Sequence, residues 1–370
     1  MHKILRQITE AGTSIWLDDL SRERLVVDGK SRNLGGLIDQ ESVLGVTTNP
    51  AIFSSAIANS SLYAADISNL ARKGLGAEAI INELTTADVS QACDLFLPTY
   101  ERTNGVDGRV SIEVDPRLAR DTAGTVSQAK ELWEKVSRSN VLIKVPATIE
   151  GIPAIRTLIS DGISVNVTII FSVPRYVEVL EAFIAGLEDR MANNLPVSGI
   201  HSVASFFVSR VDTDIDPKLK SHKDSAALNL LGKAAVANAR LAYQHFEAVL
   251  NSPRWQKLAA AGAQIQRPLW ASTGVKDPAY DPTLYVLELI APLTVNTMPE
   301  PTLIAVRDTG SFRGNTITGR YQDAADVINQ LSHFSIDIED VAERLESEGI
   351  EKFIKPWLDL IATVEAAAGK

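Results

Sequence analysis

The chain has 370 residues, of which 45% are hydrophobic and 22% charged, and its formal net charge is −10. This composition is typical of a globular protein and excludes a disordered or fibrous chain. The acidic balance argues against a protein that holds nucleic acid by releasing counterions. The length suits about two ordinary domains, or one (β/α)₈ barrel with additional helices.

Three features bear on location and redox state. The basic N-terminal residues 1–6 are followed by no apolar signal segment. The uncharged residues 42–65 contain too many Thr, Ser and Asn side chains to span a bilayer. Cys93 is the only cysteine, which excludes an internal disulfide and a cysteine-based zinc site, and we expect it to be a small buried hydrophobe. We therefore expect a cytoplasmic protein that binds neither membranes nor nucleic acid.

Short apolar runs typical of β-strands alternate with longer helical patterns. The eight predicted strands span residues 14–17, 42–46, 110–114, 141–145, 163–169, 202–207, 268–271 and 293–296. Helical patterns between them include residues 121–139, 152–160, 173–192, 226–250 and 282–290. Eight strands separated by helices predict an α/β fold, a (β/α)₈ TIM barrel.

The chain beyond Arg307 shows no further strand pattern. Residues 308–315 are loop-like, and three amphipathic helices are predicted at residues 322–331, 338–346 and 350–368. We expect a single domain over residues 1–370, in which residues 308–370 form a helical extension that packs on one end of the barrel.

Lys144 interrupts the apolar run of residues 141–145. Parallel strands are usually covered on both faces, so an ammonium group there is costly to bury. Either a carboxylate neutralises it in a structural ion pair, or the amine loses its proton readily and becomes a nucleophile toward carbonyl carbon. A permanent carboxylate partner, or a side chain directed outward among the helices, would contradict the second interpretation.

A second strand carries misplaced polar groups. Ser164, Asn166 and Thr168 alternate with the aliphatic residues between Ile163 and Ile169, so that the two sets lie on opposite faces. In a barrel, we expect the polar set to point inward and the aliphatic set to pack against helices.

Other candidate residues lie at or just past the carboxyl ends of predicted strands, namely Asp18, Thr47, Asn49, Glu113, Ser205, Phe207, Arg210 and Ser272. Taken alone, Asp18 could cap a helix and Asn49 could form a turn. Glu113 and Arg210 could be solvated charges at the surface. Their shared position at the end where barrel enzymes carry out their chemistry favours a catalytic site.

The sequence shows no metal-binding pattern. The five histidines have neither HExxH nor HxH spacing. The acidic residues 212–216 imitate the start of an EF-hand, but Pro217 and Lys223 stand where that loop needs Gly and Glu. We expect a hydrated acidic turn there and no metal.

Two motifs resemble the transaldolase family. Residues 44–51 (LGVTTNPA) resemble its first signature. Residues 141–148 (VLIKVPAT), followed by residues 150–152 (EGI) and 162–168 (GISVNVT), resemble its second. By motif the resemblance covers about residues 18–276, and the helical tail resembles the longer bacterial subgroup without the phosphoglucose isomerase domain that is fused to some relatives.

The resemblance implies a cofactor-independent barrel enzyme of the non-oxidative pentose phosphate pathway. It would transfer a dihydroxyacetone unit from sedoheptulose 7-phosphate or fructose 6-phosphate to glyceraldehyde 3-phosphate or erythrose 4-phosphate. Its partners would be small phosphorylated sugars, and self-association is left open.

The resemblance also implies individual roles. Lys144 would form the Schiff base, and Asp18 would handle the proton of the C4 hydroxyl. Glu113 and Thr168 would position a catalytic water. The implied substrate-binding residues are Thr47, Asn49, Asn166, Ser205, Phe207, Ser272 and, for phosphate, Arg210.

The segment 271–276 (ASTGVK) departs from the family pattern. Ser272 is retained, but Gly274 stands where familiar members carry a phosphate-binding arginine. Our hypothesis is that Lys276 supplies the missing cation, and the alternative is a solvated lysine.

Two other functions remain open from the sequence. A class I aldolase would share the Schiff base but release a free small carbonyl compound, such as dihydroxyacetone. A non-catalytic barrel would bind sugar phosphates without forming any reducible adduct.

Overall fold

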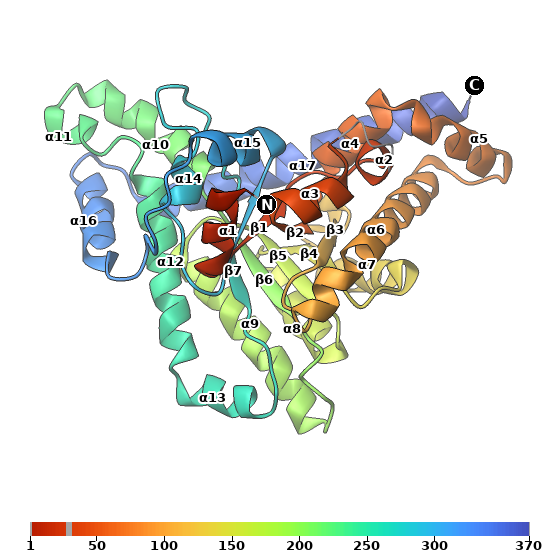
Figure 1. Cartoon of the computed structure of the whole chain (residues 1–370), viewed down its shortest axis with the longest axis horizontal. Coiled ribbons are helices and arrows are strands. Elements are labelled where there is room, and N and C mark those ends of the chain that lie inside the picture. Colours follow the sequence, from red (N-terminus) through yellow and green to blue (C-terminus); the bar gives the residue numbers. More distant parts are fainter. Residues whose placement is uncertain (1, 27–31, 370) are drawn as a thin grey trace.

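The computed structural model describes residues 2–26 and 32–369. Eight parallel strands follow one another in sequence order around a closed barrel, and the last pairs with the first (Figure 1). The strands are β1 (Thr13–Leu17), β2 (Val43–Val46), β3 (Arg109–Glu113), β4 (Val141–Pro146), β5 (Val165–Ile170), β6 (Ser202–Phe207), β7 (Arg267–Ala271) and β8 (Thr294–Met298). All eight predicted strands are therefore confirmed, as is the (β/α)₈ fold.

Helices surround the barrel and extend it (Figure 1). They are α1 (Lys3–Glu10), α2 (Arg22–Leu25), α3 (Leu34–Glu41), α4 (Pro50–Asn59), α5 (Ala64–Arg72), α6 (Ala77–Arg102), α7 (Thr122–Val136), α8 (Gly151–Asp161), α9 (Val173–Ala192), α10 (Ser209–His222), α11 (Ser225–Leu228), α12 (Ala234–Leu250), α13 (Pro253–Ala260), α14 (Leu284–Leu287), α15 (Glu300–Thr309), α16 (Tyr321–Ser332) and α17 (Ile338–Ala368), with short 3₁₀ turns η1 (Ser61–Tyr63) and η2 (Pro116–Leu118).

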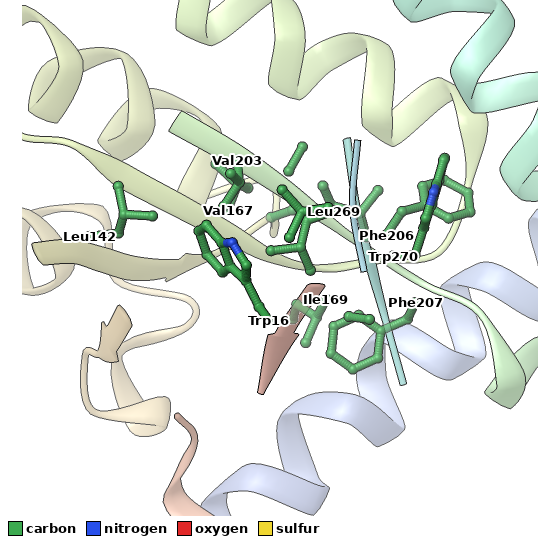
Figure 2. Close-up of a cluster of buried hydrophobic side chains, with 14 of the residues drawn as sticks. Trp16, Leu142, Val167, Ile169, Val203, Phe206, Phe207, Leu269 and Trp270 are labelled. Carbon is green, nitrogen blue, oxygen red and sulfur yellow. The ribbon is translucent and has the colours of Figure 1, made fainter. Parts of the chain in front are cut away.

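Large apolar side chains fill the barrel interior. Trp16 belongs to a buried hydrophobic cluster that includes Leu142, Val203 and Leu269 (Figure 2). A Cβ atom on Gly45 would lie 2.6 Å from the indole ring of Trp16, so only glycine fits at that position of β2. This packing closes the middle of the barrel and confines any pocket inside the barrel to its ends.

The amino end of the barrel is closed by a buried ion pair. Arg267 Nη2 lies 2.9 Å from Asp107 Oδ1, and the hydroxyl of Ser14 donates to the other carboxylate oxygen of Asp107. Both charges are thus paired and hydrogen-bonded, as burial requires. The carboxyl end is left for a functional site.

Two predicted helices are shorter than expected. Residues 226–250 form α11 and α12 instead of one helix, because the chain turns at Gly232, whose φ is +68°. Of residues 282–290, only the four of α14 are helical. Both errors arise because apolar periodicity does not reveal where a turn interrupts it.

The C-terminal extension also differs from its prediction. Residues 338–346 and 350–368 form one helix, α17, which continues through Pro356. Its buried side is unbroken, with Leu345, Phe353 and Leu360 all buried, and tertiary packing of such a face outweighs local propensity.

Helix α17 crosses the carboxyl end of the barrel. It packs against α4, α5, α6 and α10 and touches β5. Figure 1 shows it as the long blue helix that reaches the C-terminus beside α4 and α5. By contrast, α16 packs on α12, on the outside of the barrel.

The acidic residues 212–216 belong to α10 and do not form the expected hydrated turn. Asp212 and Asp216 are buried and accept hydrogen bonds from the hydroxyls of Tyr285 (2.8 Å) and Tyr280 (2.7 Å). These partners lie far away in the sequence, so the acidic run alone does not reveal them.

The prediction that Cys93 is a small buried hydrophobe is confirmed, because it lies in the core on α6. Among the residues that the structure describes, no helix combines the length and apolar character needed to cross a membrane.

Candidate active site

A cavity of about 250 Å³ lies at the carboxyl end of the barrel. Ten of the twelve predicted site residues line it, namely Asp18, Thr47, Asn49, Lys144, Thr168, Ser205, Phe207, Arg210, Ser272 and Lys276. The other two, Glu113 and Asn166, are hydrogen-bonded to members of this group. The structure thus brings all twelve together.

Lys144 lies at the centre of this cluster. Glu113 on β3 and Lys144 on β4 are register partners, so their side chains meet on the inner face of the barrel. Lys144 Nζ donates to Glu113 Oε2 and to the carbonyl oxygen of Thr48, each at 3.1 Å. The side chains of Lys144 and Glu113 are only 5% and 6% exposed.

The structure thus shows a carboxylate partner, which would contradict the nucleophilic interpretation of Lys144 if the pairing were permanent, whereas the side chain points inward as expected. The partner is Glu113, itself a predicted site residue. Burial raises the pKa of the Glu113 carboxyl, Lys144 opposes this shift, and the nearby Asp18 adds to it. Glu113 is thus a better proton acceptor than an exposed glutamate. Transfer of a proton from Lys144 to Glu113 would replace a buried ion pair by two neutral groups.

Asp18 is the second carboxyl of the site. It follows β1, and its Oδ1 accepts a 2.6 Å hydrogen bond from the hydroxyl of Thr47. Ser21, not Asp18, caps α2, so the helix-cap explanation fails. Burial raises the pKa of Asp18, and Lys144 partly offsets that shift. The half-buried Asp18 thus lies within electrostatic range of the same ammonium group that is paired with Glu113.

A chain of hydrogen bonds crosses the barrel from β6 to β3. The Ser205 hydroxyl donates to Asn166 Oδ1 (2.7 Å), and Asn166 Nδ2 donates to the Ser111 hydroxyl (3.0 Å). Asn166 thus points inward, as predicted. Thr168 also lines the cavity, and its buried hydroxyl has no hydrogen-bond partner in the described protein. A buried hydroxyl of this kind is suited to bind water or substrate.

The predicted alternation along β5 ends after Thr168. The register with β6 shifts between Val167 and Ile170, and Ile169 has a φ of +56°, which is unusual for a β-branched residue. The shift brings Ile169 close to α17, since a methyl group at Gly349 would lie 3.7 Å from Ile169 Cγ2.

The opposite side of the cavity is cationic. Arg210 is the second residue of α10, its guanidinium carbon lies 5.3 Å from the centroid of the Phe207 ring, and its buried Nη1 has no hydrogen-bond partner in the described protein. Burial lowers the pKa of Arg210, which is the sign of a cation that lacks a close counter-ion. This cationic end of the cavity suits an anion.

Lys276 fills the space beside Gly274. Its Nζ lies 3.9 Å from the position of a Cβ atom on Gly274, and it lines the cavity. Among the described residues, neither Lys276 nor Arg210 forms an ion pair with a carboxylate. The Ser272 hydroxyl lies 3.0 Å from that of Ser209 and joins the β7 loop to the start of α10.

Asn49 caps a helix and also lines the cavity. Its Oδ1 accepts from the backbone N–H of Ile52 (3.0 Å) and caps α4, while the residue also lines the cavity. Five lining residues were not predicted as site residues, namely Ala271, Gly274, Thr297, Pro299 and Phe353. Thr297 was missed because β8 continues two residues beyond its predicted end, and Phe353 because it comes from α17.

Fold and site together define a class of protein: a (β/α)₈ barrel enzyme with a buried lysine between two carboxyls and a cationic subsite. A family model described as "Transaldolase/Fructose-6-phosphate aldolase" matches residues 15–364. The chain therefore belongs to the transaldolase/fructose-6-phosphate aldolase family. The match extends beyond the motifs and includes most of α17.

Individual relatives agree with the family match. The chain is 54% identical to a protein named transaldolase from Arthrobacter sp. (strain FB24), over 98% of this chain and 96% of the relative. It is 55% identical to a transaldolase from Renibacterium salmoninarum, with the same coverage. It is 51% identical to one from Thermobifida fusca, over 97% of each chain.

Proposed function

We propose that this enzyme transfers a dihydroxyacetone unit between phosphorylated sugars through a Schiff base on Lys144. The donors are sedoheptulose 7-phosphate and fructose 6-phosphate, and the acceptors are glyceraldehyde 3-phosphate and erythrose 4-phosphate. The proposal depends most on one observation: Lys144 Nζ lies 3.1 Å from a carboxyl of raised pKa, in a cavity that holds a second such carboxyl. We also infer a place in the non-oxidative pentose phosphate pathway and, because charged sugars do not cross a bilayer unaided, in the cytoplasm.

The first step forms the iminium. Glu113 accepts a proton from the Lys144 ammonium group, and the neutral amine attacks the C2 carbonyl of the donor. The resulting carbinolamine loses its hydroxyl as water, and Glu113 returns the proton that this departure requires. The unpartnered hydroxyl of Thr168 can hold that water in the cavity.

The second step breaks the C3–C4 bond. Asp18 removes the proton of the C4 hydroxyl, and C4 becomes the carbonyl carbon of the departing aldose. The electron pair of the C3–C4 bond flows to the iminium nitrogen and leaves an enamine on Lys144. Addition of the acceptor aldehyde to C3 reverses these events, and Asp18 returns its proton to the new hydroxyl.

The phosphate group of each sugar would bind between Arg210 and Lys276. Both side chains line the cavity without a carboxylate partner in the described chain. A phosphate satisfies such cations through charge-assisted hydrogen bonds.

Product analysis distinguishes this function from the class I aldolase, a reaction that the family description also includes. Fructose 6-phosphate is incubated with and without erythrose 4-phosphate, and sedoheptulose 7-phosphate and free dihydroxyacetone are measured. We expect rapid formation of the new ketose with acceptor and little free dihydroxyacetone without it. Net cleavage at a rate comparable with transfer would instead identify an aldolase.

A further inference from the structure

One face of α17 points into the active site. Gly349, Phe353 and Trp357 are spaced four residues apart and so share a helix face. Phe353 lines the cavity that holds Lys144. Trp357 lines a neighbouring cavity of about 270 Å³, whose wall also includes Glu113. Successive turns of one helix therefore cover both sides of the Lys144–Glu113 pair.

Helix α17 comes close to other residues of the site at Gly349. A Cβ atom at this position would lie 3.5 Å from the Phe171 ring and 3.7 Å from Arg210 Nη1. The helix backbone thus rests directly beside the cationic end of the site. Figure 2 shows a C-terminal helix passing beside Ile169 and Phe207, which fits this placement.

Phe353 is the residue of α17 that faces the reacting nitrogen. Its ring centroid lies 5.4 Å from Lys144 Nζ, within the range of a cation–π interaction, and the side chain is buried. The iminium keeps a positive charge on this nitrogen, so the same ring faces the covalent intermediate. A phenyl ring has no exchangeable proton and leaves no room for water where it stands.

We propose that Phe353 covers the covalent intermediate and determines how it divides between transfer to an acceptor and loss to water. The inference rests on the proposed function. In transfer, C3 of the enamine bonds to the carbonyl carbon of the acceptor. In the loss reaction, C3 takes a proton from water, the hydroxide adds to C2, and the C2–N bond breaks. This releases dihydroxyacetone and the free Lys144 amine, with a net consumption of one water.

The test measures the ratio of dihydroxyacetone released to ketose formed, in one reaction with fructose 6-phosphate and erythrose 4-phosphate. Phe353→Ala removes the ring, and Phe353→Leu keeps an apolar side chain in case the alanine variant does not fold. Leu358→Ala is the matched control, because Leu358 lies on the same helix and is 49% exposed. Thermal unfolding of each variant confirms that α17 remains docked.

We expect the release-to-transfer ratio to rise about tenfold in Phe353→Ala, less in Phe353→Leu, and not at all in Leu358→Ala. A purely structural role for Phe353 would lower both products together and leave the ratio constant. A wild-type ratio in both folded Phe353 variants would overturn the inference while leaving the proposed function intact. Absence of any borohydride-reducible adduct in the wild-type enzyme would overturn both.

Discussion

The carboxylate of Glu113 lies 3.1 Å from the ammonium nitrogen of Lys144, inside a barrel that exposes neither side chain by more than 6%. A buried ion pair of this kind contributes little net stability, because desolvation of the two charges offsets their attraction. The same proximity gives Lys144 a proton acceptor within hydrogen-bond distance. The pair is therefore better explained by its chemistry than by stability.

Glu113→Gln tests this role. The amide cannot accept the ammonium proton or return it to the departing hydroxyl, so we expect kcat to fall by about 10²–10⁴-fold. Pre-steady-state borohydride trapping tests the role of Glu113 directly, because it measures the rate at which the adduct forms on Lys144. Adduct formation at the wild-type rate would show that the proton leaves Lys144 by another route.

Asp18→Asn separates the two chemical steps. The amide retains an acceptor for the Thr47 hydroxyl but cannot take the C4 hydroxyl proton. We expect the variant to form the iminium with fructose 6-phosphate but not to cleave it. Mass spectrometry after borohydride reduction should find an intact six-carbon adduct on Lys144. A three-carbon adduct formed at the wild-type rate would contradict the role of Asp18.

Lys276→Ala tests the proposed phosphate subsite. Hydrogen bonds to charged groups contribute about 1.5–3 kcal/mol, so we expect KM for fructose 6-phosphate to rise about 10–100-fold, with a smaller effect on kcat. The control is Lys257→Ala on α13, an exposed lysine outside the cavity. An unchanged KM would mean that Lys276 is only a solvated lysine.

Asp212 should make folding stability depend on pH. Burial raises its pKa to about 7, although hydrogen bonds from Ala235 N–H and the Tyr285 hydroxyl oppose the shift and Asp216 adds to it. The folded protein then binds this proton more tightly than the unfolded chain, whose aspartate pKa is about 3.9. The protonated Asp212 therefore contributes its full stabilisation of the fold below about pH 4. This contribution is lost as the pH rises through about 7, and the free energy of unfolding falls by up to roughly 4 kcal/mol.

Asp212→Asn should remove this pH dependence of folding stability. Urea unfolding between pH 5 and 8 measures the free energy of unfolding of both proteins. Asp214→Asn is the matched control on the same helix. Arg344 and Lys218 lower the pKa of Asp214, so its contribution to stability is constant above pH 5. Parallel pH profiles for wild type and Asp212→Asn would contradict the expectation.

Much of the architecture can be predicted from local patterns. The eight apolar runs and the polar groups that follow them are local signals, and they identify Asp18, Glu113, Lys144 and Thr168 without any knowledge of tertiary contacts. Strand register then follows from the barrel, and it places Glu113 beside Lys144. The sequence allowed a carboxylate partner for Lys144 but did not identify it as Glu113, because their contact joins residues 31 positions apart.

The remaining features depend on long-range packing. No pattern around Phe353 marks it as a site residue, since its position follows from where α17 docks. The irregularity at Ile169 arises from pairing with β6 and from contact with α17, neither of which is encoded in the alternation of β5. The predicted break at residues 347–349 does not occur, because α17 and its buried face continue through it.

The most direct test of the Schiff base on Lys144 is borohydride reduction in the presence of fructose 6-phosphate, followed by peptide mass mapping. A Schiff base on Lys144 predicts irreversible inactivation, with the label on the peptide that contains Lys144. It also predicts that Lys144→Ala folds normally, because the raised pKa of Glu113 lets that carboxyl become neutral without its partner, but gains no label and transfers nothing. A label on another lysine, or wild-type turnover in Lys144→Ala, would contradict it.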